Sequence, residues 1–298
     1  MTATKVGATA TANERVNCRP PYGTANPMLD TPSITDAEFA QFQRLIYQIA
    51  GISLADSKKA LLVGRLGKRL KALGLKSFGD YYRYVASGAD AHERQTMVDL
   101  LTTNETYFFR EEAHFDFLRQ VIVPQHPAGQ SLEIWSGACS TGEEVYTIAM
   151  VLADTLGVNG RWTILGSDIS TRVLAIAQRG QYWFDRTRGL PNEYLRKYCL
   201  KGVRSQEGSF IIDPALRRHT RFMQINLNAP LPDIGKFHVI FLRNVMIYFD
   251  NDTKRQVIAR MIEKLRPGGY FIVGHSESLN GLTETLKPVK PTIYRLPA

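Results

Sequence analysis

The chain has 298 residues, 44% hydrophobic and 22% charged, a composition typical of a globular protein with one large or two ordinary domains rather than of a disordered chain. No apolar run approaches the ~20 residues that a membrane-spanning helix needs. The formal net charge of +9 indicates an acidic partner, and the total alone leaves nucleic acid, anionic lipid and acidic protein open.

Residues 1–32 are predicted to be a flexible leader. The stretch is rich in Ala, Thr, Asn and Pro, a composition that does not build a packed core, and it lacks the apolar block of a secretion signal. The three cysteines, Cys18, Cys139 and Cys199, are odd in number and far apart. A disulfide framework is therefore not expected, and a reducing cytoplasm fits the pattern best.

Residues 33–104 are predicted to form an all-helical domain. Four segments have helical periodicity: 35–51, 56–74, 77–88 and 90–104. Thr35 and Glu38 have the spacing of a capping box at the start of the first segment. Asp56 is the expected N-terminal cap of the second segment.

The second helical segment carries an unusual run of charge. Between Lys58 and Lys76 the chain has seven basic residues and no acidic one. A solvated helix face usually mixes charge signs to gain i, i+4 pairs, so this face predicts an acidic partner, with a plain solvated face as the alternative. The candidate contact residues are Lys58, Lys59, Arg65, Lys68 and Arg69.

Residues 105–298 alternate between strand and helix patterns. Strands are expected at 131–138, 161–168, 220–226, 238–244 and 270–276, and helices at 111–125, 143–157, 170–180 and 253–265, with a turn at 266–269. This alternation predicts a parallel, doubly wound sheet with helices on both faces, whose ligands bind at the carboxyl ends of the strands. Residues 181–219 break the alternation and are predicted to hold a β-hairpin insertion.

The stretch 133–146, EIWSGACSTGEEVY, has two glycines in the spacing of a phosphate-binding loop. Glu143 and Glu144 then follow where that loop would carry Lys and Ser or Thr. A carboxylate at this helix start is favoured by the helix dipole but would repel a triphosphate. Asp168 ends the next strand, where an acidic residue is the usual partner of ribose hydroxyls. The pattern favours an adenosine-like ligand with a cationic end, and S-adenosylmethionine (SAM) fits this description.

Five motifs in this order resemble the chemotaxis receptor protein-glutamate O-methyltransferase family, known as CheR. They are TTNETYFFR, WSGACSTGEE, SDIS, QINL and LRNVMIYFD. The resemblance covers about residues 33–298. It implies a class I methyltransferase (Rossmann-like) sheet with a small β insertion, preceded by an all-α domain that faces the receptor. It also implies methyl transfer from SAM to glutamate side chains of chemoreceptors, which yields a methyl ester and S-adenosylhomocysteine (SAH).

The resemblance further implies which residues form the site. The positions that match donor-binding residues are Asn104, Thr106, Arg110, Glu144, Asp168, Asn226, Leu227, Arg243 and Asn244. By this match Glu144 is the ligand-facing carboxylate, and Glu143 is expected to cap its helix. Arg110 and Tyr248 match residues near the transferred methyl, so we expect Arg110 to align the acceptor carboxylate and Tyr248 to supply a hydroxyl contact. A glutamate is already ionised at neutral pH, so no general base is required.

The implied partner is the acidic, helical methylation region of chemoreceptors in the cytoplasm. The basic helix is the candidate docking surface. In some family members the insertion binds a receptor C-terminal peptide, but Val203 and Arg204 stand in this loop, so peptide binding stays open. A monomer without direct membrane insertion is expected. The six histidines form no i, i+4 pair, so no metal site is expected either. Phe108 and Phe109 are expected to pack, and His275 to be structural.

Two alternatives remain. One is a SAM-dependent methyltransferase acting on nucleic acid, which the basic charge permits. Residues 244–248, NVMIY, lack the prolines of the segment that many base-methylating enzymes carry after the fourth strand, so nucleic acid is not the expected partner. The other alternative is a module that binds the donor without catalysis, although Arg110 and Tyr248 are both present.

Overall fold

The computed structural model of the protein describes residues 32–298. The expected flexible leader, apart from Pro32, lies outside the described residues, as does Cys18. Across residues 32–298 there is no helix with the length and apolar character needed to cross a bilayer.

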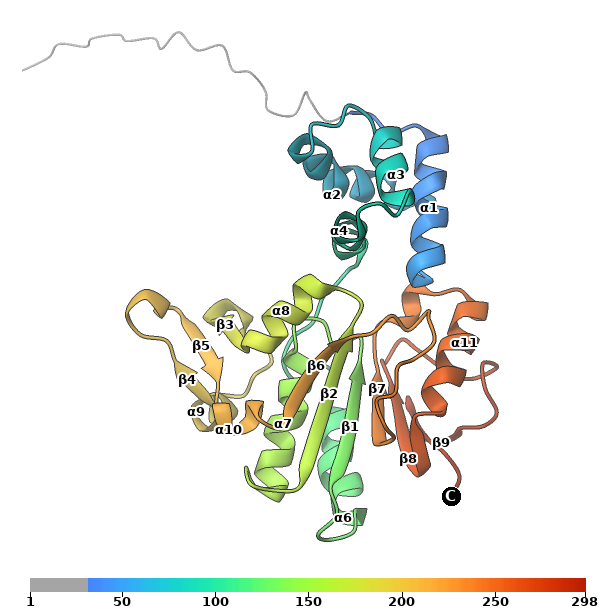
Figure 1. Cartoon of the computed structure of the whole chain (residues 1–298). Helices are drawn as coiled ribbons and strands as arrows, with labels where there is room; N and C mark the ends of the chain where they lie inside the picture. Colours follow the sequence, from blue (N-terminus) through green and yellow to red (C-terminus); the bar gives the residue numbers. More distant parts are fainter. Residues whose placement is uncertain (1–31) are drawn as a thin grey trace, which may run out of the picture. The chain divides into compact units, whose positions relative to one another are not determined.

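The N-terminal part is a group of four helices, drawn in blue to green in Figure 1. They are α1 (Asp36–Ala50), α2 (Lys59–Ala72), α3 (Phe78–Ala86) and α4 (Ala91–Leu101). The predicted capping box of Thr35 and Glu38 is confirmed in both directions. The prediction for Asp56 is wrong, because a 3-10 turn, η1 (Asp56–Lys58), precedes α2. The Asp56 carboxylate instead accepts a hydrogen bond from Gln43 Nε2 at 2.9 Å.

The helical core is built from the apolar stripes of these helices. Phe42 packs against Phe78 edge to face and stacks on Tyr81, with ring centroids 6.4 and 6.1 Å apart. Leu62 and Leu66 of α2 are fully buried in the same core. Burial of each such side chain contributes about 1.5–3 kcal/mol, which is enough to hold short helices that would be marginal alone.

The basic run on α2 is not the free single-sign face that the sequence predicted. Arg69 makes a two-pronged ion pair with the buried carboxylate of Glu93 on α4, and Lys59 pairs with Asp36 at 2.6 Å. The acidic partners come from other helices, so the local sequence could not show them. The residues of the run that stay exposed are Lys58, Lys68, Lys71 and Lys76.

The C-terminal part contains a seven-stranded sheet in the order β6-β2-β1-β7-β8-β10-β9. Its strands are β1 (Leu132–Gly137), β2 (Trp162–Asp168), β6 (Thr220–Gln224), β7 (Phe237–Leu242), β8 (Leu265–Val273), β9 (Lys287–Lys290) and β10 (Ile293–Arg295). The first five strands in the spatial order are parallel, as predicted, and β10 and β9 add an antiparallel edge. The sequence alone does not reveal this edge, because every residue of β9 is exposed and no buried pattern marks the strand.

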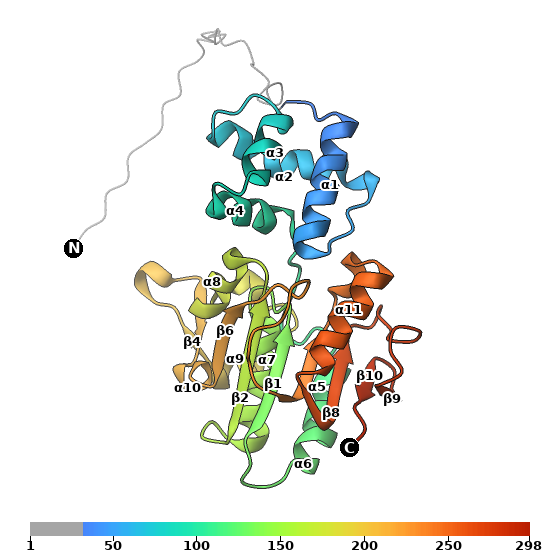
Figure 2. The same ribbon diagram turned by 45° about the vertical axis from the view of Figure 1, so that its right-hand side comes forward.

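Alternate residues of each strand face opposite layers. Ile134 and Phe241 belong to the core that faces α5 (Ala113–Phe117) and α7 (Glu143–Leu156). Trp135 and Ile240 point to the other core, which is covered by α11 (Asn251–Ile262). Figures 1 and 2 show these helices beside the sheet. A helical stretch continues from α5 through η2 (Leu118–Ile122) to α6 (Val123–Gln125), and α8 (Thr171–Arg179) follows β2.

The turn predicted at 266–269 is wrong, because β8 begins at Leu265 and runs through it. The strand starts opposite Phe237 and shifts register before Val239 pairs with Tyr270. Gly268, with φ of +73°, allows this irregularity. A bulged strand start resembles a turn in sequence, because both need Pro and Gly.

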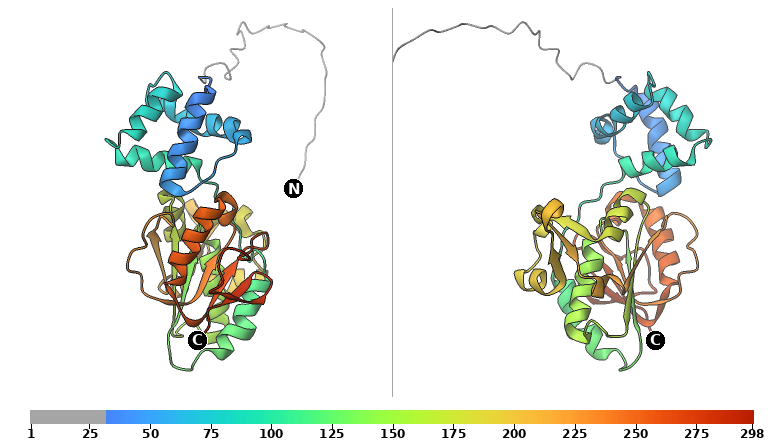
Figure 3. Two further views of the ribbon diagram at one scale, coloured as in Figure 1. Left: turned by 90° about the vertical axis from the view of Figure 1, so that its right-hand side faces the viewer. Right: turned by 60° about the vertical axis from the view of Figure 1, so that its left-hand side comes forward.

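The insertion contains the predicted hairpin, formed by β4 and β5, within a three-stranded antiparallel sheet in the order β3-β5-β4. Its parts are β3 (Gln181–Trp183), η3 (Phe184–Thr187), α9 (Asn192–Tyr198), β4 (Cys199–Lys201), η4 (Arg204–Gln206), β5 (Ser209–Ile212) and α10 (Pro214–Arg217). It appears in yellow and orange beside α7 in Figure 3. The hairpin of β4 and β5 is present, but β3 joins it from across two short helices, which local turn signals do not reveal.

The helical group is joined to the sheet by directional contacts. Asp99 of α4 caps α8, where its carboxylate accepts hydrogen bonds from the Thr171 N–H and hydroxyl and from the Arg172 N–H, at 3.1, 2.8 and 3.2 Å. Tyr47 donates a hydrogen bond to Asp250 at 2.8 Å. These contacts place α1, α4 and the start of α2 over the carboxyl ends of the strands, where the sequence predicted the ligand.

Candidate active site

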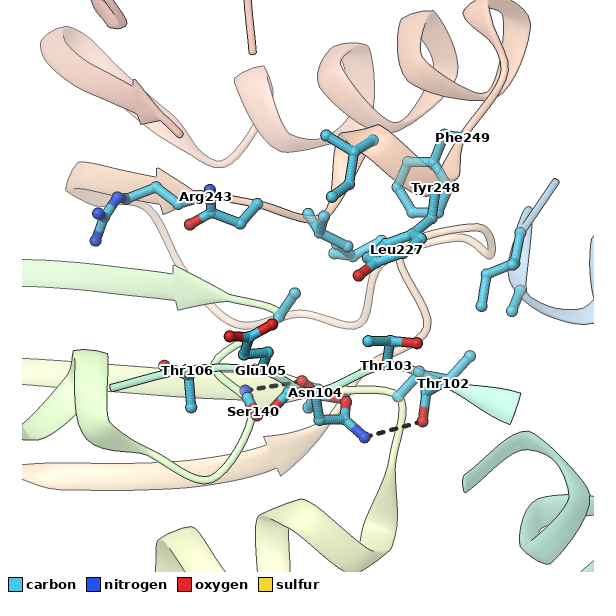
Figure 4. Close-up of a pocket in the computed structure, with 18 of the residues that line it drawn as sticks. Thr102, Thr103, Asn104, Glu105, Thr106, Ser140, Leu227, Arg243, Tyr248 and Phe249 are labelled. Atoms are coloured by element: carbon cyan, nitrogen blue, oxygen red, sulfur yellow. Dashed lines mark hydrogen bonds between the residues drawn. The ribbon is translucent and has the colours of Figure 1, made fainter. Parts of the chain in front are cut away.

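A cavity of about 450 Å³ opens at the carboxyl ends of the parallel strands and is lined from both the helical group and the sheet. All nine predicted donor-binding residues line it, together with Tyr248. Of the five predicted receptor contacts, Lys58 and Arg65 also line the cleft. Lys59, Lys68 and Arg69 are not among its lining residues. Figure 4 shows part of this wall, with segment 102–106 across from Leu227 and Tyr248.

The loop between β1 and α7 forms the floor of the cleft. Gly142 has φ of +95°, and a Cβ there would lie 2.8 Å from Ala177, so the turn requires glycine. Ala138 and Ser140 also have positive φ. The Ser140 N–H donates to Asp168 Oδ2 at 2.9 Å, and its hydroxyl donates to the Asn104 carbonyl at 2.9 Å. The loop is thereby fixed to the end of β2 and to segment 102–106, as Figure 4 shows.

Asp168 is held at the end of β2 by two backbone N–H groups. Its two oxygens accept the N–H groups of Ser140 and Ser170, both at 2.9 Å, which leaves lone pairs on the cleft side. Burial raises the pKa of Asp168, although those N–H groups oppose the shift. A buried acceptor of this kind gains most from hydroxyl donors.

Arg243, directly after β7, is the centre of the inner wall of the cleft, which is the side formed by the ends of the strands. Its guanidinium donates to Glu144 Oε2 at 2.8 Å and to Glu111 Oε2 at 2.9 Å, and it also reaches the Arg110 carbonyl. Glu111 further accepts from Asn244 Nδ2 at 3.1 Å. Burial alone would raise the pKa of Glu111, but the Arg243 charge and these hydrogen bonds outweigh it and lower the pKa to about 2. Two carboxylates therefore share one guanidinium beside the cleft.

Glu277 fixes the loop that carries Arg243 to Tyr248. Its buried carboxylate accepts three backbone N–H groups, from Asn244, Met246 and Gly274, each at 2.8 Å. The loop ends in a single 3-10 turn, η5 (Met246–Tyr248). Glu277 thus sets where Tyr248 lies, although it does not line the cleft.

Arg110 lines the cleft from the segment that precedes α5. It donates to the Glu105 carbonyl at 2.9 Å, and its guanidinium lies 5.8 Å from the Tyr107 ring centroid. Neither contact is an ion pair, so the charge of Arg110 is available to a bound anion. Phe108 and Phe109 are buried, as predicted for packing residues.

Arg65 brings a third guanidinium to the cleft, from α2. It donates from Nη1 to the carbonyls of Leu101 and Thr102, both at 3.0 Å. Burial, helped by the nearby charge of Arg172, lowers the pKa of Arg65. Arg65 thus provides hydrogen-bond donors for the carbonyl groups at the end of α4, while its charge stays beside the cleft.

Comparison with known proteins decides the family. Residues 104–295 match the family described as "CheR methyltransferase, SAM binding domain", and residues 37–102 match "CheR methyltransferase, all-alpha domain". The chain belongs to the CheR methyltransferase family. It is a SAM-dependent methyltransferase of chemotaxis, as the motifs predicted.

Curated relatives agree with this assignment. The chain is 40% identical over 273 residues to the chemotaxis protein methyltransferase of Escherichia coli, which covers 90% of this chain and 94% of the relative. It is 38% identical to chemotaxis protein methyltransferase 2 of Pseudomonas aeruginosa, covering 92% and 99%. The match to the Borreliella burgdorferi protein is 36% identical and covers 88% and 95%.

Glu143 has a different place in this CheR-family chain from the helix cap that was predicted. Its carboxylate is fully buried and pairs with Arg186 of the insertion at 2.6 Å. Thr141 donates its hydroxyl to the same carboxylate at 2.6 Å, and Tyr182 donates to the Thr141 carbonyl at 2.8 Å. The glycine loop is therefore connected directly to the insertion. A glutamate at the start of a helix gives the same sequence pattern whether its carboxylate is exposed or buried. The sequence therefore could not distinguish a helix cap from a buried ion pair.

Glu111 and Glu277 were not predicted as site residues. Glu111 follows Arg110 and looked like the first turn of a helix, but its φ of +59° places it before α5. Glu277 lies far along the chain from the residues that it holds. Seven non-glycine residues of the described part have positive φ, and Phe109, Glu111, Ala138, Ser140 and Asn244 are five of them. Such strained backbone clusters at functional sites.

The structure also groups residues that the sequence kept apart. Glu111, His114 and His275 each offer a ligand-type atom, and these atoms lie within 4.8 Å of one another. Burial, and then the Arg243 charge, lower the pKa of His114 to about 3. Histidine spacing in the sequence does not reveal this group, because the group assembles from two distant segments of the chain.

Proposed function

We propose that the chain methylates side-chain carboxylates of glutamates in chemoreceptors, forming glutamate methyl esters and SAH. The observation that carries this proposal is that donor-type groups and acceptor-type groups line one cleft. Glu144 and Asp168 suit a cationic adenosine derivative, and Arg110 and Tyr248, which line the same cleft, suit an incoming carboxylate.

The donor half of the cleft fits SAM by its chemistry. Asp168 has lone pairs for ribose hydroxyls, and Glu144 is a carboxylate for the α-ammonium. Glu144 is held by Arg243 and by the Ser136 hydroxyl at 2.7 Å, so it is oriented before the ligand arrives. Leu227 supplies a buried apolar surface, while Asn226 donates to the Ile49 carbonyl at 2.6 Å and ties this wall to α1.

SAM supplies an electrophilic methyl on a sulfonium, and a glutamate oxygen that displaces the sulfur leaves a methyl ester and the thioether SAH. The acceptor needs no base, because a carboxylate is already charged at neutral pH. The positive sulfonium and the negative carboxylate both become neutral, so a site that excludes water favours the step. Arg110 orients the acceptor carboxylate through its free guanidinium, and Tyr248 contributes a hydroxyl contact.

The acceptor side faces the helical group. Lys58 and Arg65 give the mouth of the cleft a positive character, and the exposed Lys68 and Lys71 extend it along α2. An acidic receptor helix would be drawn to this surface and would present one glutamate to Arg110. The expected setting is the cytoplasm, with the chain acting as a monomer.

The insertion is a candidate second receptor contact. Its sheet has β3 and β4 at the two edges, and exposed edges accept added strands from peptides. Val203 is 68% exposed in the loop after β4, and it gives that loop less freedom than glycine would. Methylation of receptor fragments with and without their C-terminal tails distinguishes the two roles of the insertion. If the insertion binds the tail peptide, removal of the tail reduces methylation; if it contacts the receptor elsewhere, removal has no effect.

Methyl transfer itself tests the proposal. The chain is incubated with SAM labelled on the methyl group and with a panel of receptor cytoplasmic fragments, with DNA and RNA as parallel acceptors. We expect label on a receptor fragment, released as methanol by mild base, and no label on nucleic acid. Base-stable label, or label on DNA or RNA alone, would reject the proposal.

A further inference from the structure

Behind the inner wall of the cleft, Glu111, the partner of Arg243, stands beside two histidines that the proposed methyl transfer does not use. Glu111 and His114 lie at the start of α5, and His275 follows β8. Glu111 Oε2 is 3.6 Å from His114 Nδ1, and the rings of His114 and His275 have centroids 5.1 Å apart. The ligand-type atoms of all three lie within 4.8 Å of one another, a spacing that allows one ion to touch all of them.

The hydrogen bonds around His114 Nε2 favour one tautomer of the ring. The Thr292 hydroxyl lies 2.6 Å from the Pro291 carbonyl, to which it can donate its only hydrogen. In that arrangement the imidazole N–H is the donor in the 2.8 Å contact between His114 Nε2 and Thr292 Oγ1. Nδ1 of the neutral ring then carries a lone pair.

Within residues 32–298, that lone pair has no hydrogen-bond partner. His114 Nδ1 is buried without a hydrogen bond, and the group that it faces is the Glu111 carboxylate, which is another acceptor. A buried polar atom left without a partner costs about 1–3 kcal/mol, and two acceptors facing each other add repulsion. A cation between them removes both penalties.

We propose that Glu111 Oε2, His114 Nδ1 and a ring nitrogen of His275 bind a divalent transition-metal ion with the chemistry of Zn²⁺. Two imidazoles and one carboxylate form an established zinc ligand set that leaves a fourth position open. The Thr292 hydroxyl that accepts from His114 Nε2 is the outer partner that commonly fixes a ligating histidine. His275 is exposed and gives the ion a path from solvent.

The local charge accommodates an added cation. Arg243 is the cation nearest to this group, and the carboxylates of Glu111 and Glu144 both pair with it. These three side chains sum to one negative charge. A divalent ion at Glu111 Oε2 would change this sum from one negative to one positive charge, and the separate Arg243–Glu144 pair would stay in place.

The test uses the full-length chain without a histidine tag, freed of metal by a chelator. Zn²⁺ is titrated in a calorimeter into wild type, His275→Ala and His92→Ala. His92 is exposed on α4 and serves as the matched control. We expect one site in wild type and in His92→Ala, and affinity at least about tenfold weaker in His275→Ala. Equal affinity in all three proteins, or no binding to wild type, overturns the proposal.

A second measurement needs no variant. Co²⁺ is added to the metal-free wild type, and its visible absorption is recorded before and after Zn²⁺ is added. Intense bands typical of four or five ligands, removed by Zn²⁺, support the site. A weak spectrum identical to that of hydrated Co²⁺ overturns it. The SAH affinity of His275→Ala, expected within about twofold of wild type, shows that the variant is folded.

Discussion

Arg243 shows how much of the site depends on single side chains. One buried guanidinium holds Glu144 and Glu111 and contacts the Arg110 carbonyl, so it connects the donor wall to the segment that carries Arg110. Charged hydrogen bonds of this kind contribute about 1.5–3 kcal/mol each. The geometry of the donor half therefore depends on Glu111 as much as on the residues that line the cleft.

Glu111→Gln is expected to weaken SAH binding by roughly 10- to 100-fold, because Arg243 loses one of its two charged partners and shifts. Glu112→Gln is the matched control, since Glu112 is the exposed neighbour and should bind SAH like wild type. Calorimetry with SAH measures both. Equal affinity for wild type and Glu111→Gln would show that Glu111 does not position Arg243.

Arg110→Ala should lower the turnover number by about 10²- to 10³-fold, because the acceptor carboxylate loses its orienting charge. SAH affinity should stay within about tenfold of wild type, and Arg110→Lys should recover part of the rate. Labelled-methyl transfer and SAH calorimetry give the two numbers. Unchanged turnover in Arg110→Ala would remove Arg110 from the reaction.

Donor affinity should also depend on pH through Asp168. Burial raises the pKa of this carboxyl in the free protein, while hydroxyl donors of a bound ribose favour its ionised form. SAH affinity should therefore fall as the pH decreases from neutral toward that raised pKa. The affinity of Asp168→Asn should be weaker and nearly independent of pH over the same range. A parallel pH dependence in both proteins would assign the titration to another group.

The residues predicted from the sequence fall into two kinds. Asp168 and Glu144 follow strands and glycine turns whose pattern is local, so a linear motif shows them. Glu111 and Glu277 act on backbone and side chains that are remote in sequence, and their positions follow only from the folded chain. Arg69 was assigned to a partner surface because Glu93, its ion-pair partner, lies on another helix.

Among the secondary-structure elements, the insertion has a closer connection to the donor loop than its place in the sequence suggests. Tyr182 of β3 reaches the Thr141 carbonyl, and Arg186 of η3 pairs with the buried Glu143. Arg188 lies 5.2 Å from the Tyr107 ring centroid. Anything that moves β3 and η3 therefore acts on the glycine loop and on the segment before Arg110.

Arg186→Met should weaken SAH binding by about tenfold, because Glu143 would be left buried without its partner and the loop would rearrange. Arg186→Lys should be intermediate. Arg196→Met on α9 is the control, since Arg196 is exposed. Calorimetry with SAH and denaturant unfolding are measured on each protein. A loss of stability with unchanged SAH affinity would mean that the insertion and the donor loop are independent.

Elements with a buried, periodic pattern were predicted well, and those set by tertiary contacts were not. The five parallel strands and the capping box of α1 follow from local pattern. The edge strand β9 is entirely exposed, and β3 pairs with a strand beyond two short helices. In both cases the pairing partner, rather than the segment itself, determines the structure.

For the molecule as a whole, the helical group is part of the active site as well as a separate family domain. It supplies Lys58 and Arg65 to the cleft and caps α8 through Asp99. The same group carries the exposed lysines of α2. Receptor recognition and catalysis are thus expected to share one continuous surface.

Replacing Lys68 and Lys71 together by Glu should raise the KM for a receptor fragment about tenfold and should leave SAH affinity unchanged, because both side chains are exposed and act by charge. The KM should approach that of wild type at high salt, where the attraction is screened in both proteins. Arg69→Glu is a contrasting variant, since breaking its pair with the buried Glu93 should cost about 3–5 kcal/mol of stability. A KM unaffected by the double replacement would place the receptor on another surface.

All of the proposed chemistry requires one cleft shaped for adenosine joined to a positively charged sulfur centre. Calorimetric titration of the purified chain with SAM and with SAH is the sharpest test of this requirement. We expect a single site for each ligand, with binding of both strongly reduced in Asp168→Ala. Absence of heat and of any protection against unfolding with either ligand would contradict it.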